Sequence, residues 1–144
     1  MIPIVVATVC AGLFSGAALY VSLVEHPARV GCGPELAVRE FAPSYRRGTV
    51  LQASLALGGS LAAIVGAWKQ AEPKLLVGGL LLLAVVPFTL IVILPTNNRL
   101  LSPSLDPKSS EAVALLTRWG HLHAVRVFLS FVAFVVFVWR LANG

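Results

Sequence analysis

The sequence predicts an all-α integral membrane protein whose helices form an antiparallel four-helix bundle. Hydrophobic residues make up 58% of the 144 residues and charged residues only 12%, and the mean hydropathy is +0.88. These values are typical of membrane proteins, and the length fits a single domain over residues 1–144. The apolar residues form four stretches, each near the ~20 residues that a ~30 Å hydrocarbon core requires.

We expect the membrane spans at residues 2–24, 48–68, 75–95 and 122–141. The first stretch lies where a signal peptide would, but it lacks a basic leading segment and its apolar run is too long, so we interpret it as a true span. The other three are apolar on every side, which a helix of a soluble protein is not. Pro87 removes a backbone hydrogen bond from the third span and predicts a kink there.

The lengths of the connections predict how the helices are ordered. Residues 69–74 join the second and third spans so closely that these two must form an antiparallel hairpin, which puts the connections 25–47 and 96–121 together on the opposite side. Most Lys and Arg residues lie in these two long connections, so the positive-inside rule places them in the cytoplasm. We expect a multi-pass protein, in the plasma membrane if the host is bacterial.

The composition also limits the partners of the chain. The net charge is +5, but the only adjacent basic pair is Arg46–Arg47, and nucleic-acid binding requires a denser basic surface. We therefore expect the lipid bilayer, and no nucleic acid, as a partner. Small residues at four-residue spacing, such as Gly12 and Gly16, let helices approach closely. This pattern fits contacts within one bundle and leaves a homo-oligomer open.

Polar side chains concentrate at the span ends that meet the long connections. Residues at i, i+4 and i+7 share one face of a helix, and three such sets occur there. They are Tyr45, Thr49 and Gln52; Trp119, His123 and Arg126; and Thr89, Ile93 and Thr96. We therefore predict a polar pocket where these stripes meet.

The same stripes contain residues suited to acid–base chemistry. His123 is a candidate general base, and Arg126 with the Asn97 amide is a candidate site for developing negative charge. Glu25 or Tyr45 would orient the base. An arginine within a span costs on the order of 2.5–3.5 kcal/mol, which snorkelling or a pairing with Glu25 would reduce. A simple hydrogen-bonded role for His123 stays open.

A metal site is the less favoured interpretation of the polar residues, and we expect no cofactor. The alternative is copper, iron or zinc held by Glu25, His26, His121 and His123, but this spacing matches no strong metal motif and His121 is out of phase with His123. Cys10 and Cys32 form no CxxC pair, so neither a disulfide relay nor a cysteine zinc site is indicated.

The chain resembles a family of small four-span membrane proteins that includes the anthrone oxygenases. The similar segments follow in order along nearly the whole chain: Glu25-His26-Pro27-Ala28, Phe41 through Tyr45 to Gln52, Pro87-Phe88-Thr89, Pro95-Thr96-Asn97 with Leu100, and Arg118-Trp119 with His123 and Arg126. Each motif alone is weak, whereas the ordered set is fairly specific. A minority of the family, mostly in polyketide gene clusters, is tied to anthrone oxidation.

The resemblance implies an enzyme that oxidises an anthrone or a related lipophilic phenol to a quinone with O2, without a recognised flavin or haem. On this hypothesis His123 is the base, and Arg126 and Asn97 stabilise the anion. Glu25 and His26 orient the base or act as a relay to it. The residues expected to bind substrate are Tyr45, Thr49, Gln52, Thr96 and Trp119.

Two other functions stay open from the sequence. One is a metal-dependent version of the same oxidase. The other is a non-catalytic membrane protein, either a small-molecule binder or a structural bundle, in which the polar layer only fixes helix register. Polarity is confined to one end of the spans, which argues against a transporter.

Overall fold

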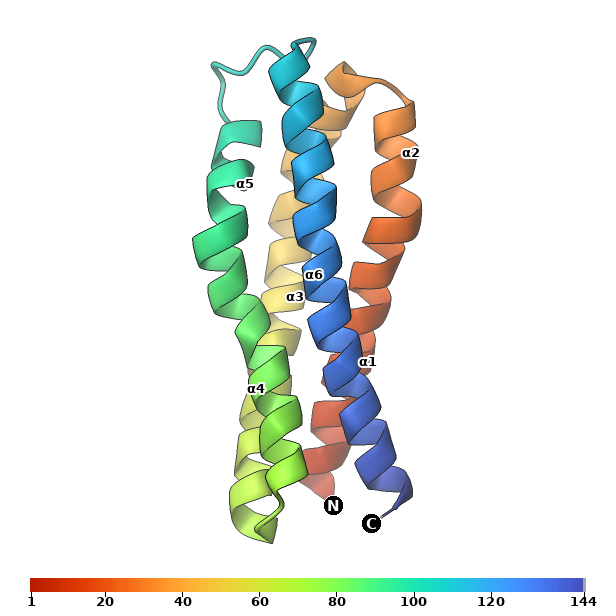
Figure 1. Cartoon of the computed structure of the whole chain (residues 1–144), viewed down its shortest axis with the longest axis vertical. Coiled ribbons are helices and arrows are strands. Elements are labelled where there is room, and N and C mark those ends of the chain that lie inside the picture. The colour runs from red at the N-terminus through yellow and green to blue at the C-terminus, as the bar shows by residue number, and fades with distance from the viewer. Residues whose placement is uncertain (144) are drawn as a thin grey trace.

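The computed structural model describes residues 1–143, which form four long helical rods lying side by side (Figure 1). The first rod consists of α1 (Ile2–Tyr20), η1 (Val21–Glu25) and α2 (His26–Gly31), and the second is α3 (Pro34–Gln70). The third consists of α4 (Pro73–Phe88), η2 (Thr89–Ile93) and α5 (Leu94–Leu100), and the fourth is α6 (Ser110–Ala142). Within residues 1–143 there are no strands. The all-α prediction is confirmed.

Each rod packs mainly on two others, which closes the bundle. α1 packs on α3 and α6, and α4 packs on the same two helices, so the order around the bundle is α1, α3, α4, α6. All four rods are long and apolar enough to cross a membrane, which makes the chain a multi-pass membrane protein.

The connections lie where the predicted topology puts them. Both termini and the α3–α4 turn are at one end of the bundle, and the other two connections are at the opposite end (Figure 1). In the α3–α4 turn Ala71 adopts a left-handed conformation with φ of 50°. Glu72 then caps α4 by accepting a hydrogen bond from the Lys74 backbone N–H at 3.4 Å. The predicted antiparallel hairpin is therefore present.

The helices extend well beyond the predicted spans. α3 begins at Pro34 and contains 37 residues, about 55 Å at 1.5 Å per residue, whereas a hydrocarbon core is ~30 Å thick. α6 begins directly after Ser109, whose Oγ accepts from the Ala112 N–H at 3.1 Å. Much of the two long connections is therefore helical, because hydropathy marks where a helix leaves the lipid and not where the helix ends.

Two π-helical segments interrupt the first and third rods at the same end of the bundle. η1 ends two residues before Pro27, and η2 ends two residues before Pro95. A proline has no N–H and its ring clashes with the carbonyl four residues earlier, so a wider turn relieves both problems. The His26 N–H accordingly bonds to Val21 O, and the Leu94 N–H to Thr89 O. Such wide turns occur often at functional sites.

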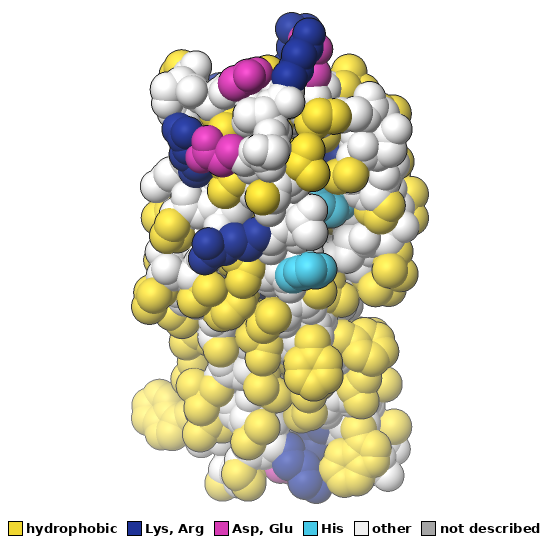
Figure 2. Space-filling view, turned by 45° about the horizontal axis from the view of Figure 1, so that its top comes forward, with side chains coloured by type: hydrophobic (Ala, Val, Ile, Leu, Met, Phe, Trp, Pro, Cys, Tyr) yellow, Lys and Arg dark blue, Asp and Glu magenta, His cyan; other side chains and the backbone are white. Residues whose placement is uncertain are grey.

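Two apolar clusters form the core, one toward each end of the bundle. The cluster near the termini comprises Ile4, Ala7, Ala11, Phe14, Ala18, Ala56, Ala63, Ala67, Leu75, Leu82, Val85, Ala133 and Phe137. The other comprises Ala37, Phe41, Ile93, Leu100, Leu105, Ala112, Leu116 and Trp119. Along α3 and α6 the buried polar residues Gln52 and His123 lie between the two clusters. Figure 2 shows the surface charges gathered mainly at the end with the long connections, above a predominantly hydrophobic surface.

Candidate functional site

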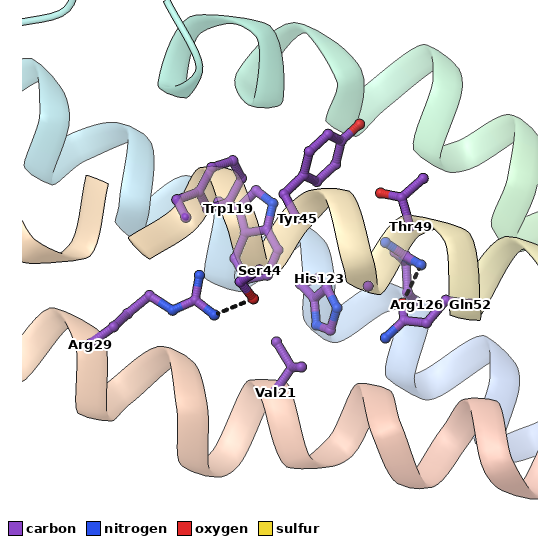
Figure 3. Close-up of a pocket in the computed structure, with 11 residues that line it drawn as sticks. Val21, Arg29, Ser44, Tyr45, Thr49, Gln52, Trp119, His123 and Arg126 are labelled. Atoms are coloured by element: carbon purple, nitrogen blue, oxygen red, sulfur yellow. Dashed lines mark hydrogen bonds between the residues drawn. The ribbon is translucent and has the colours of Figure 1, made fainter. Parts of the chain in front are cut away.

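A small polar cavity lies inside the bundle between the first rod, α3 and α6, at the level where the two apolar clusters meet (Figure 3). Its volume is about 40 Å³, which has room for a molecule such as O2 or a few waters. We call it the inner cavity. It is lined by Val21, Arg29, Phe41, Ser44, Tyr45, Gly48, Thr49, Gln52, Trp119, His123 and Arg126.

His123 lines the inner cavity with one ring nitrogen engaged. The side chain is 2% exposed, and Nδ1 lies 2.9 Å from Ser22 Oγ. The ring stacks on the Trp119 indole, with centroids 4.6 Å apart and an interplanar angle of 22°. Among residues 1–143 nothing is within hydrogen-bond distance of Nε2. The orienting partner of the imidazole is therefore Ser22. The expectation that Glu25 or Tyr45 orients the ring is wrong, because neither forms a hydrogen bond with it.

Arg126 lines the same cavity without an acidic partner. Its Nη2 donates to Gln52 Oε1 at 2.6 Å, its Nε is buried without a partner, and Cζ lies 5.6 Å from the centroid of the Phe14 ring. No carboxylate within the described part of the chain comes within 4.0 Å of this guanidinium. The expected pairing with Glu25 does not occur.

Glu25 forms an ion pair with Arg29, which was not among the predicted site residues. The Arg29 Nη2 donates to Glu25 Oε1 and, at 3.3 Å, to Ser44 Oγ. Ser44 Oγ in turn donates to Glu25 Oε1 at 2.6 Å, and Arg29 Nε forms an ion pair with Glu40 Oε2 at 3.0 Å. Arg29 reaches the inner cavity and Glu25 does not. The i, i+4 spacing of Glu25 and Arg29 places them on one helix face, which explains why Glu25 pairs there.

Asn97 supports Trp119 and does not line the inner cavity. Its Oδ1 accepts a hydrogen bond from Trp119 Nε1 at 2.9 Å, and its side chain is 1% exposed. The expectation that Asn97 stabilises a substrate anion is therefore not supported by its position. Its contact instead fixes the indole that stacks on His123.

His26 packs against the same indole. Its ring centroid is 5.0 Å from that of Trp119, and Nε2 lies 3.1 Å from the Leu116 carbonyl oxygen. Gly120 makes room for this contact, because a Cβ at that position would lie 2.9 Å from His26 Nε2. Like Asn97, His26 is absent from the lining of the inner cavity, so the relay role expected of it with Glu25 has no direct contact to His123.

The three site residues predicted on α3 line the inner cavity together with the three predicted on α6. Tyr45, Thr49 and Gln52 all line the inner cavity. Tyr45 stacks on Phe41 with centroids 5.7 Å apart, and its hydroxyl points away from His123 (Figure 3). Gln52 is 6% exposed and bonds directly to Arg126.

The stripe expected on the third rod is not a single face. Thr89 lines a second cavity, whereas Thr96 is buried outside all of the hollows described in this section. The π-helical segment η2 begins at Thr89 and ends before Thr96, and its wide turn rotates the residues that follow relative to an α-helix. The spacing of Thr89, Ile93 and Thr96 therefore does not predict a shared face here.

The four residues of the alternative metal site are not brought together. His121 is exposed, His26 bonds to the Leu116 carbonyl, and Glu25 pairs with Arg29. Nowhere in residues 1–143 do three or more His, Cys, Asp or Glu side chains gather as metal ligands.

Three polar residues of the site lie outside the sequence-based prediction: Ser22, Arg29 and Ser44. A signal for two of them is present, because Ser22, His26 and Arg29 have the same i, i+4, i+7 spacing as the stripes on α3 and α6. A lone serine in an apolar run and an arginine in a long connection both have ordinary explanations in a membrane protein, and these hide the pattern.

Two larger hollows adjoin the inner cavity. The second cavity, of about 100 Å³, is mostly apolar and lies between α3 and the third rod; it shares Thr49, Gln52 and Arg126 with the inner cavity. The outer groove, of about 550 Å³, runs between the first rod and α3 and shares Val21, Ser44, Gly48 and Gln52 with it. The rest of the outer groove is lined by Ala17, Tyr20, Glu25, Glu40, Pro43, Arg47 and Leu51.

Fold and site together define a multi-pass α-helical membrane protein with a small cavity, lined by several polar side chains, at the boundary between two apolar cores. Comparison with known sequences identifies the family. The chain belongs to the anthrone oxygenase family, whose sequence model matches residues 41–136, and this confirms the expected resemblance.

Two curated relatives support that membership. An anthrone oxygenase of Claviceps purpurea (strain 20.1) is 28% identical over 141 residues, which cover 86% of this chain and 80% of the relative. The anthrone oxygenase tpcL of Aspergillus fumigatus is 45% identical over 47 residues, 31% of this chain and 29% of the relative. No solved structure matches the chain.

Proposed function

We propose that this protein is a membrane-embedded oxygenase that converts a lipophilic phenol of the anthrone type to a quinone with O2. One observation carries the proposal: His123 and Arg126 line the same cavity, and each side chain keeps at least one nitrogen atom that forms no hydrogen bond within the described residues. Membership of the anthrone oxygenase family supports the reaction class. A polyketide-derived anthrone is the expected substrate, and the plasma membrane is the expected location if the host is bacterial.

His123 is the proposed general base. An anthrone has a methylene group between two aromatic rings, and removing one of its protons gives a phenolate-like anion. If Nδ1–H donates to Ser22 Oγ, the free Nε2 keeps its lone pair and can accept that proton. In that tautomer Ser22 Oγ accepts from Nδ1–H and helps to orient the ring, and the stacked Trp119 holds the plane of the ring.

Arg126 is the proposed stabiliser of the anion. A guanidinium without a carboxylate partner in a largely apolar bundle is unfavourable by itself, and a bound phenolate would supply the missing charge. Gln52 holds the guanidinium through its Oε1 and leaves its own NH2 group available to the substrate oxygen. Fixed donors aimed at a developing oxyanion are a large contribution to catalysis in many enzymes.

The reaction balances without any further reductant. The carbanion adds O2 to give a peroxide anion, which takes up one proton. Loss of the second C–H proton with cleavage of the O–O bond then releases water and leaves a carbonyl, so that one methylene group and one O2 molecule give one carbonyl group and one water. All four electrons come from the substrate, and the proposal therefore uses no cofactor. The apolar second cavity beside Arg126 is the proposed position of O2.

The test is conversion of 1,8-dihydroxyanthrone by the purified full chain in nanodiscs under ¹⁸O2. We expect a rate above that of empty nanodiscs, one ¹⁸O atom in the new carbonyl, and one O2 consumed per quinone formed. A rate equal to that of empty nanodiscs would contradict the proposal. Elemental analysis of the active preparation separates the metal-dependent alternative, which requires stoichiometric copper, iron or zinc.

A further inference from the structure

The inner cavity is too small for the substrate that the proposed function requires. At about 40 Å³ it is far below the roughly 300–1,000 Å³ of pockets that enclose drug-sized ligands. A three-ring aromatic molecule therefore cannot lie inside it. The outer groove, at about 550 Å³, falls within that range and shares three lining residues of α3, Ser44, Gly48 and Gln52, with the inner cavity.

We infer that the outer groove is the substrate-binding site and that Gly48 is the threshold over which the reactive carbon of a flat polycyclic phenol reaches His123. This inference rests on the proposed function. Gly48 lines both the outer groove and the inner cavity. A Cβ built on Gly48 would have no heavy atom within 4 Å, so the space above this residue is open.

The composition of the groove matches an amphipathic aromatic ligand. Ala17, Tyr20 and Leu51 line it within the predicted spans, where the rings of the ligand would lie. Glu25, Glu40 and Arg47 line it beyond those spans and leave polar atoms near phenolic hydroxyl groups. The groove is open between the first rod and α3, so a lipophilic phenol can reach it laterally from the bilayer.

Gly48 contributes no side chain to the wall that the groove and the cavity share. It lies in the interior of the 37-residue helix α3, where glycine is less favourable than alanine by roughly 1 kcal/mol. Packing does not require it, because the space at its Cβ is empty. Unlike Gly58, however, Gly48 lines both the groove and the cavity. Any larger side chain would project into the connection.

A second glycine of α3 provides a matched control. Gly58 lies in the same helix, likewise has no atom within 4 Å of a built Cβ, and lines neither the outer groove nor the inner cavity. Leucine at either position adds the same side chain to the same helix at a site where a Cβ meets no heavy atom within 4 Å. Only leucine at position 48 would obstruct the path to His123.

The experiment measures binding separately from turnover. In a background of Trp68→Phe and Trp139→Phe, Trp119 is the one remaining tryptophan of the three, and its fluorescence reports on ligand at the inner cavity. The ligand is 1,8-dihydroxyanthraquinone, which cannot be oxidised at the reactive carbon. We expect Gly48→Leu to raise its Kd at least about tenfold, and Gly58→Leu to leave the Kd unchanged. Gly48→Ala, which shortens no contact, provides a milder variant and should raise the Kd less than Gly48→Leu.

The outcomes separate this inference from the proposed function. If wild type oxidises the anthrone but Gly48→Leu binds the anthraquinone and turns over as wild type does, the threshold is refuted while the oxygenase activity stands. That same result is expected if a phospholipid occupies the outer groove. If wild type neither binds the anthraquinone nor oxidises the anthrone, both proposals are overturned. Thermal unfolding of each variant shows whether a loss of binding reflects loss of fold.

Discussion

Arg126 Nη2 donates a 2.6 Å hydrogen bond to Gln52 Oε1 across the bundle, from α6 to α3. This neutral partner holds the guanidinium in place and leaves its charge uncompensated among the described residues. The contact is the central relationship of the site, because it makes an anionic ligand favourable at a level where the bundle is otherwise apolar.

Arg126→Gln tests this relationship. The substitution keeps a hydrogen-bonding side chain and removes the charge, so we expect kcat for anthrone oxidation to fall on the order of 10²-fold or more, the usual effect of losing an oxyanion donor. Thermal stability should be unchanged or higher, because an unpaired charge is removed. Arg118→Gln is the matched control, since Arg118 is exposed on the same helix. Equal losses in both variants would remove the argument for a specific anion site.

Ser22→Ala tests the orientation of the base. Without Ser22 Oγ the Nδ1 of His123 loses its 2.9 Å partner, and the imidazole ring loses the hydrogen bond that orients it. We expect kcat to fall by roughly tenfold with KM little changed, and Ser22→Thr to restore most of it by returning a hydroxyl. Ser54→Ala is the control, because that exposed hydroxyl bonds only to the Val50 carbonyl oxygen of its own helix. A wild-type kcat in Ser22→Ala would show that the hydroxyl does not orient the base.

Asn97→Leu tests whether the buried amide is structural. The variant leaves the Trp119 Nε1–H buried without its 2.9 Å acceptor, and an unsatisfied buried donor costs about 1–3 kcal/mol. We expect a lower melting temperature in detergent, measured by circular dichroism. Asn98→Leu, at the exposed neighbouring position, should melt as wild type does. If Asn97→Leu were as stable as wild type and lost only activity, Asn97 would have to contact substrate after all.

Gly120→Ala tests the packing behind the indole. The added Cβ would lie 2.9 Å from His26 Nε2, so the imidazole must leave the Leu116 carbonyl or the two helices must separate. Overpacking of this kind costs typically about 1–3 kcal/mol, and we expect a corresponding loss in unfolding free energy. Gly58→Ala is the control, because its Cβ meets nothing and alanine favours the helix. A Gly120→Ala protein as stable as Gly58→Ala would contradict the close contact.

The sequence predicts the four helices and their antiparallel order because hydropathy depends on the residue types of each segment and not on distant contacts. The stripes on α3 and α6 were also predictable. Both helices are regular α-helices at those positions, so i, i+4 and i+7 do share a face, as Gln52 and His123 show. The prediction was wrong where this regularity ends. On the third rod the wide turn of η2 begins at Thr89, and Thr89 and Thr96 do not share a face.

Pair contacts between helices could not be predicted in the same way. A neutral Gln52 is the partner of Arg126, while the expected carboxylate, Glu25, is already taken by Arg29 within its own rod. Such pairings depend on the distances between side chains of different helices in the folded bundle. Asn97 illustrates the same limit, because its bond to Trp119 follows from how the third rod packs on α6 and from no local pattern.

The most direct test of the proposed role of His123 compares two histidines that lie two residues apart on α6. His123 is buried in the inner cavity and His121 is exposed on another face of the helix. The measurement is O2 consumption during oxidation of 1,8-dihydroxyanthrone by His123→Gln and His121→Gln, each purified in nanodiscs and shown to melt as wild type does. We expect His121→Gln to retain the wild-type rate and His123→Gln to lose about 10²-fold or more. Wild-type O2 consumption by a folded His123→Gln protein would contradict the proposal that this imidazole is the base.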